Sequence, residues 1–156
     1  MPIGEWKKFA GSTDSPIIIP SIFIPGWANG RHAAIDVSIV SPLQSQLIRK
    51  AAEEPGSAAV KRFREKMTKY YTPCENEGIQ FFPAIVETFG GWHPDSEKIL
   101  IKLAQQLASH TGVPSEETSR HFFQRLGILL VRGNAALITT RTPTFVDPVV
   151  DGDLDY

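Results

Sequence analysis

The sequence predicts an α/β fold, in which a small mixed β-sheet is flanked by helices. Two apolar, strand-like stretches at 17–24 and 32–40 enclose a polar turn, where Asn29-Gly30 is a strong hairpin signal because both residues tolerate positive φ. A third strand-like stretch, IQFFPAIVE at 79–87, follows a helix long enough to cross the sheet, so we expect it to run parallel to a neighbouring strand. Apolar residues at helical spacing between and after these stretches predict helices packed against the sheet.

Four helices are expected from this spacing. They are predicted at residues 43–54, 57–71, 94–110 and from 115 onward. Ser57 is the expected N-cap of the second helix. Thr72-Pro73 is expected to end that helix, because proline cannot continue the hydrogen-bond pattern.

One folded domain is expected over residues 16–141 of the 156-residue chain. Residues 1–15 mix Gly, Ser, Thr and charged residues without periodicity, and we predict an irregular leader there. Residues 142–156 are rich in aspartate and contain no lysine or arginine, so we predict a disordered acidic tail.

Charge and cysteine content narrow the class of protein. The net charge of −1 excludes a basic field over the whole surface, although a local basic face is compatible with it. The single cysteine, Cys74, excludes an internal disulfide framework and is typical of a reducing compartment. The N-terminus lacks the apolar stretch of a secretory signal, and no apolar run reaches the ~18 residues that a membrane span needs. We therefore expect a nuclear or cytoplasmic protein without membrane contact.

Asp36 is the residue that most needs an explanation, because it lies inside the apolar stretch AAIDVSIV. A buried carboxylate costs several kcal/mol unless something binds it. One alternative is a divalent metal such as Mg²⁺, which takes carboxylates together with phosphate oxygens and serves phosphodiester hydrolysis beside a lysine. The other is a structural carboxylate that pairs with Arg31, Lys66 or a backbone amide.

The ordered series of short motifs around Asp36 resembles a known nuclease family. The series comprises Pro20-Ser21, Trp27, Gly30, AIDVS at 34–38, SPL at 41–43, GSA at 56–58, Lys66, Cys74, FPAIVETFGGW at 82–92 and LVRGNA at 130–135. It is similar to the restriction-endonuclease-like domain that follows reverse transcriptase in many non-LTR retrotransposons, a branch of the PD-(D/E)XK nuclease superfamily. The resemblance implies DNA as the partner and Mg²⁺ or Mn²⁺ as the cofactor of an active copy. It also implies a restriction-endonuclease-like core that here lacks the family's N-terminal helix and strand.

The resemblance also assigns roles to individual residues. Asp36 takes the position of the metal-binding acid, and Lys66 takes that of the catalytic lysine, with Lys69 as its alternative. Ser21 occupies the position of the first acid, and a neutral hydroxyl there is a weak ligand for Mg²⁺, which implies a degenerate metal site. Glu87 ends the third strand and either adds a carboxylate near Asp36 or caps the turn that follows. Convergence of Asp36, Glu87 and Lys66 in a solvent-reachable cleft beside Ser21 would favour a nuclease origin, whereas an Asp36 sealed beneath a helix would favour an α/β interaction protein.

Arg62, Lys66 and Lys69 share one flank of the second helix by their spacing. This flank either contacts a phosphate backbone or is a solvated helix face. Three hypotheses follow. The first is a retroelement-derived endonuclease-like domain, a hydrolase by ancestry with a compromised site. The second is a non-catalytic nucleic-acid-binding protein, and the third is an α/β interaction protein in which Asp36 is satisfied internally.

Overall fold

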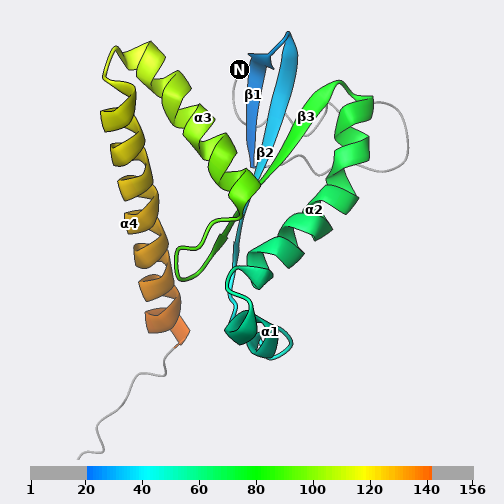
Figure 1. Ribbon diagram of the computed structural model, residues 1–156, viewed down its shortest axis with the longest axis vertical. Helices are drawn as coiled ribbons and strands as arrows, with labels where there is room; N and C mark the ends of the chain where they lie inside the picture. The colour runs from blue at the N-terminus through cyan, green and yellow to red at the C-terminus, as the bar shows by residue number, and fades with distance from the viewer. Residues whose placement is uncertain (1–20, 142–156) are drawn as a thin grey trace, which may run out of the picture.

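The computed structural model describes residues 21–141 and confirms the α/β class (Figure 1). The elements in chain order are β1 (Ile22–Ala28), β2 (Arg31–Val40), α1 (Ile48–Glu53), α2 (Ser57–Asn76), β3 (Ile79–Glu87), α3 (Pro94–Thr111) and α4 (Ser115–Arg141). The predicted leader, residues 17–20 of the first predicted strand and the predicted acidic tail lie outside the described residues. Within the described part of the chain, no helix combines the length and the apolar run that crossing a membrane would require.

The three strands form a mixed sheet in the order β1-β2-β3. The β1–β2 pair is antiparallel and turns at Asn29 and Gly30, whose φ angles of 51° and 74° fit the predicted hairpin. The β2–β3 pair is parallel, from His32 opposite Ile79 to Val40 opposite Glu87, and α2 makes the crossover between them. The predicted hairpin and crossover strand are therefore confirmed.

Helix α2 passes through Pro73, so the prediction that Thr72-Pro73 ends this helix is wrong. A proline inside a helix removes a backbone hydrogen bond and costs about 3 kcal/mol. The turn that follows carries Cys74, which is 3% exposed and packs with Ala34 and Phe81 in a buried cluster. Burial of this turn against the sheet offsets the cost of the proline.

The start of α2 also differs from the prediction. Ser57 is the first helical residue, and the N-cap is Gly56, with φ 85° and no side-chain cap. The cap comes instead from the sheet, because the Oε1 atom of Glu87 accepts a hydrogen bond from the Ala59 backbone N–H at 3.1 Å. The first helix is shorter than predicted and begins only at Ile48.

The helices cover the sheet in layers. Alternate strand residues pack against α2 in two buried clusters, one around Val40 and Ile85 and the other around Ala34 and Phe81. Helix α3 lies on the opposite face, where the Lys102 ammonium sits 4.9 Å from the centroid of the Trp27 ring. Figure 1 shows α2 and α3 on either side of the sheet, with α4 beside α3. The α2 face is the one toward which Asp36 points.

Ser96 joins the N-terminal turn of α3 to the free edge of β3. Its side chain is 0% exposed. The Oγ atom accepts from the Ile85 N–H at 2.9 Å and donates to the Pro83 carbonyl at 2.8 Å. The His93 N–H donates to the Ile85 carbonyl at 3.0 Å. These bonds satisfy backbone groups of β3 that have no neighbouring strand on that side.

His93 is the N-cap of α3, and its ring stacks on Phe63 of α2 at a centroid distance of 3.8 Å. The Nδ1 atom accepts a hydrogen bond from the Asp95 N–H at 3.2 Å, so the cap needs an unprotonated Nδ1. Burial lowers the pKa of His93, and the positive charges of Lys98 and Arg64 add to this effect while Asp95 opposes it.

This cap predicts a stability that depends on pH. Because the folded-state pKa of His93 lies below the unfolded value of about 6.5, its contribution is present above pH ~6.5 and is lost as the pH falls. Urea unfolding of the natural protein should show a lower free energy of unfolding at pH 5.5 than at pH 7.5. This decrease should be smaller by up to about 1 kcal/mol in His93→Asn, because asparagine caps the helix at both pH values. Equal pH dependence in both proteins would contradict this role.

Candidate functional site

The candidate site lies where β2 passes under α2. Ala34 and Val40 are buried on the α2 face of the strand, and strand alternation places Asp36 on the same face. The parallel register sets Asp36 opposite Pro83 of β3. The Asp36 side chain is 13% exposed, so its carboxylate is largely removed from water.

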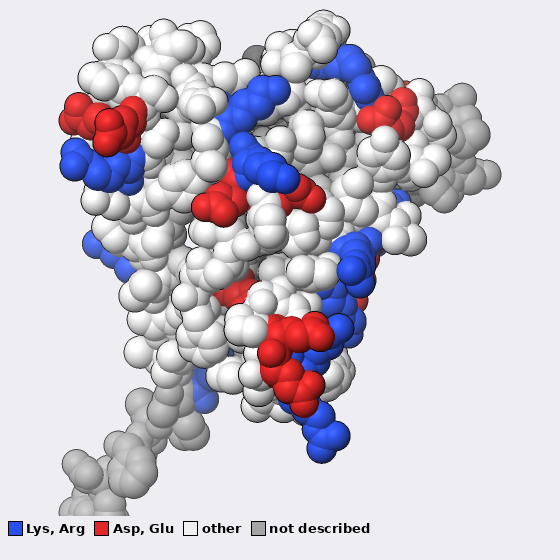
Figure 2. All heavy atoms as spheres, in the orientation of Figure 1, with Lys and Arg blue, Asp and Glu red and all other residues white. Residues whose placement is uncertain are grey.

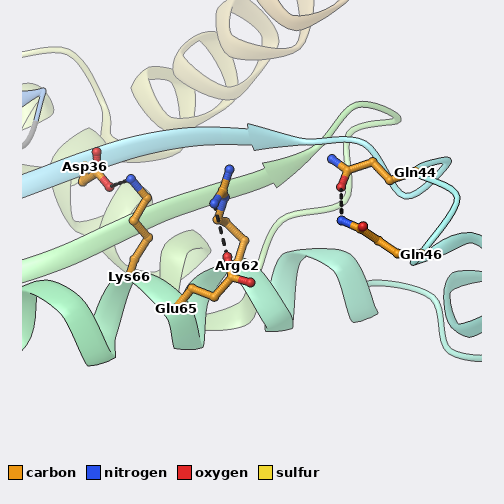
Figure 3. Close-up of polar contacts among 6 residues, drawn as sticks. All are labelled: Asp36, Gln44, Gln46, Arg62, Glu65 and Lys66. Atoms are coloured by element: carbon orange, nitrogen blue, oxygen red, sulfur yellow. Dashed lines mark hydrogen bonds and ion pairs between the residues drawn. The ribbon is translucent and has the colours of Figure 1, made fainter.

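Lys66 reaches Asp36 from the middle of α2. Its Nζ atom lies 2.7 Å from Asp36 Oδ2, and the two side chains point toward each other (Figure 3). The Lys66 side chain is 21% exposed. Arg31, another partner considered for Asp36, pairs instead with Glu75 at 2.8 Å. The structure therefore brings together the acid and the lysine that the sequence singled out.

Ser21 is exposed and immediately precedes β1. The antiparallel pairing opens with Ile22 opposite Ile35, so Ser21 would come opposite Asp36 if the same register continued by one residue. Ser21 therefore stands at the end of β1 that adjoins the Asp36–Lys66 pair. It offers a hydroxyl there and no charge.

Glu87 does not join Asp36. It lies opposite Val40, four residues beyond the Asp36 position on the ladder, which corresponds to about 13 Å along the strands. Its side chain is 8% exposed and its Oε1 atom is bound by the Ala59 N–H at the start of α2. Of the two roles considered for Glu87, the structure favours capping, although the cap serves α2 and not the turn after β3.

The predicted basic flank divides into separate contacts. Lys66 turns inward to Asp36, Arg62 pairs with Glu65 at 3.2 Å, and the Lys69 ammonium lies 4.9 Å from the Tyr70 ring. The three side chains therefore do not form one surface in this arrangement.

A different set of bases gathers on the outer side of α2. Lys50, Lys61, Arg64 and Lys69 line an open hollow of about 690 Å³ between α1 and α2. Glu54 and Glu65 line the same hollow, and Figure 2 shows basic side chains with acidic ones beside them in this region. The i, i+3 spacing of Lys61 and Arg64 could have revealed half of this set, whereas Lys50 comes from another helix and carries no local signal.

The described residues fit a resident Mg²⁺ poorly. Mg²⁺ usually takes one or two protein carboxylates, and here Asp36 supplies one, already neutralised by Lys66. Within residues 21–141, no three His, Cys, Asp or Glu side chains come together as a metal site would require. Burial, and then the charge of Glu75, raises the pKa of the Cys74 thiol, which disfavours the thiolate that a metal ligand or a nucleophile would need.

Comparison with known proteins found no matching family model, no matching curated protein and no matching solved structure.

Proposed function

We propose that this chain is a retroelement-derived endonuclease-like domain that descends from a Mg²⁺-dependent DNA phosphodiesterase and has lost one carboxylate of its metal site. The contact that carries this proposal joins Asp36 Oδ2 and Lys66 Nζ at 2.7 Å. The resemblance assigned these two residues to the metal-binding acid and the catalytic lysine, and they come from a strand and from the helix that crosses over it.

The position of Ser21 explains why the site is incomplete. Continued by one residue, the register of β1 and β2 would bring position 21 beside Asp36, where a second carboxylate would share a cation with it. A serine leaves the Lys66 ammonium to neutralise Asp36 by itself. The pair is thus stable without a metal, and we expect the natural protein not to cleave DNA.

Restoring the acid tests this proposal. Ser21→Asp should bind Mn²⁺ at millimolar concentration, detected as loss of the free-ion electron paramagnetic resonance signal, because two carboxylates then outweigh one ammonium. The same variant should nick supercoiled plasmid in Mg²⁺ or Mn²⁺, whereas the natural protein should do neither.

The control is Ser21→Asn, which matches aspartate in shape but adds no charge and should behave like the natural protein. Adding Asp36→Asn to Ser21→Asp should abolish both metal binding and nicking. If Ser21→Asp folds but neither binds Mn²⁺ nor cuts, the nuclease origin of this site is wrong, and Asp36–Lys66 is a structural ion pair.

A second candidate function, DNA binding without chemistry, is favoured by the hollow lined by Lys50, Lys61, Arg64 and Lys69. Phosphate contacts release counterions, so affinity should fall steeply with salt. Changing Lys61, Arg64 and Lys69 together to alanine should weaken duplex DNA binding at least ~10-fold and reduce the slope of log K against log salt by about 2–3.

The matched control for this measurement removes the same charge elsewhere, by changing Arg120, Arg125 and Arg141 of α4 to alanine. Fluorescence anisotropy over a salt series measures both variants. Equal losses in the two would show a general charge effect and would count against a DNA-binding hollow.

A further inference from the structure

Helix α4 packs against α3 along one side. Thr118 and Leu130 are buried, and Phe122, Phe123 and Leu126 are partly buried on this side. The Asn134 Nδ2 atom donates to the Thr88 carbonyl at 2.6 Å and fixes the C-terminal half of the helix to the loop after β3. The orientation of α4 about its own axis is therefore defined.

A second apolar stripe runs along α4 about 130° around the helix axis from Leu130. It consists of Ile128, Val131 and Ala135, which we call the outer stripe, and Ile138 continues the same spacing. Ile128 is 53%, Val131 is 67% and Ile138 is 66% exposed, and Ala135 is exposed as well. Intervals of three, four and three residues are typical of the side of a helix that packs against a partner.

The space beside the outer stripe is open. A Cβ atom added at Gly127, which lies between Leu130 and Val131 around the helix axis, would meet no described atom of another element within 4 Å. Exposed apolar side chains that follow a regular spacing mark an interaction surface, whereas scattered ones do not.

The charges of α4 restrict what can cover this stripe. From Thr118 to Arg141 the helix carries Arg120, Arg125, Arg132 and Arg141 and no aspartate or glutamate. A second copy of α4 laid on the stripe would bring arginine toward arginine, which opposes association. The complementary occupant is a segment that is both acidic and apolar.

Such a segment follows α4 directly in the same chain. Residues 142–156, TPTFVDPVVDGDLDY, contain four aspartates, no lysine or arginine, and the apolar residues Phe145, Val146, Val149, Val150 and Leu154. The outer stripe spans about 10 Å along the helix, and fifteen residues reach up to ~50 Å when extended. Thr142-Pro143 supplies a turn signal at the point where the chain would reverse.

We propose that residues 142–156 fold back on the outer stripe of α4 within the same molecule. Their apolar side chains cover Ile128, Val131 and Ala135, and their aspartates pair with Arg125 and Arg132. This intramolecular contact is independent of the proposed nuclease origin.

A spin label tests this proposal on the full chain. A nitroxide is attached to Tyr156→Cys, while Cys74 is buried and poorly reactive. The amide signals of residues 128–138 should lose at least half of their intensity, and those of the outer side of α2 at 61–69 should not change. The loss should disappear in Val131→Glu and persist in Leu129→Glu, because Leu129 is also exposed, at 63%, but lies off the stripe.

Two outcomes would overturn the proposal. One is that the amide signals of residues 128–138 keep their full intensity in the labelled protein. The other is an equal loss when isotope-enriched protein without the spin label is mixed with spin-labelled protein that is not isotope-enriched, which would mean that the tail of a second copy occupies the stripe.

Discussion

Changing Ser96 to alanine is expected to lower the free energy of unfolding by about 2–4 kcal/mol, although the change removes a single hydroxyl. The Ser96 Oγ atom is at once the acceptor for the Ile85 N–H and a donor to the Pro83 carbonyl. Ser96 is 0% exposed, so water cannot replace either bond without opening the contact between α3 and β3. Each buried backbone group left without a partner costs about 1–3 kcal/mol.

Urea unfolding followed by circular dichroism measures this loss. The matched control is Ser109→Ala on the same helix, whose Oγ donates to the Gln106 carbonyl at an exposed position. This control should change stability by less than about 0.5 kcal/mol. A loss near that of the control in Ser96→Ala would mean that the edge of β3 does not depend on the hydroxyl.

The sheet could be predicted from the sequence because its signals are local. Asn29-Gly30 sets the hairpin through the φ values that the turn requires, and the stretch after it supplies buried residues, among them Ala34 and Ile35. The parallel position of β3 follows from the length of α2, which spans the distance that a crossover must cover.

The ends of α2 could not be predicted, because tertiary contacts decide them. Pro73 stays within the helix since Cys74 is buried beside Phe81, and a cap is supplied by Glu87 from a strand that follows the helix in the sequence. A side chain distant in sequence leaves no sign near Ser57. The role of Ser96 could not be predicted for the same reason. A single serine near the start of a helix does not indicate that it binds the backbone at the edge of a sheet.

The candidate site, too, could be predicted only in part from the sequence. Asp36 could be found because a carboxylate in an apolar strand contradicts its surroundings, and Lys66 was one of the partners considered for it. The separation of Asp36 from Glu87 depends on the register of β2 against β3, which the local pattern does not contain. The division of the basic flank depends on how α2 is rotated over the sheet, which is set by packing of its apolar side.

Changing Glu87 to alanine is expected to cost about 2–3 kcal/mol, because Glu87 performs the N-terminal capping that α2 lacks in its own sequence. The N-cap Gly56 has no side chain, and the first turn of α2 has no acidic residue. The Glu87 carboxylate therefore supplies both the acceptor for the Ala59 N–H and the negative charge that favours a helix start. Ala59 is 1% exposed, so its N–H would lose its partner without access to water.

Two further variants separate the hydrogen bond from the charge. Glu87→Gln keeps an acceptor and loses only the interaction with the helix dipole, so it should cost about 1 kcal/mol. Glu77→Ala, an exposed glutamate at the other end of α2, should change stability by less than about 0.5 kcal/mol.

Magnesium decides between the two roles considered for Glu87. A cap acts without metal, so the loss in Glu87→Ala should be the same in EDTA and in 10 mM Mg²⁺, a concentration at which a bound ion with a Kd of ~0.1 mM would stabilise the folded state by about 2.7 kcal/mol. If Mg²⁺ stabilises the natural protein and this effect is absent from Glu87→Gln, then Glu87 binds metal after all. In that case the carboxylate would have to leave the Ala59 N–H to reach the ion, and α2 would lose its cap as the metal binds.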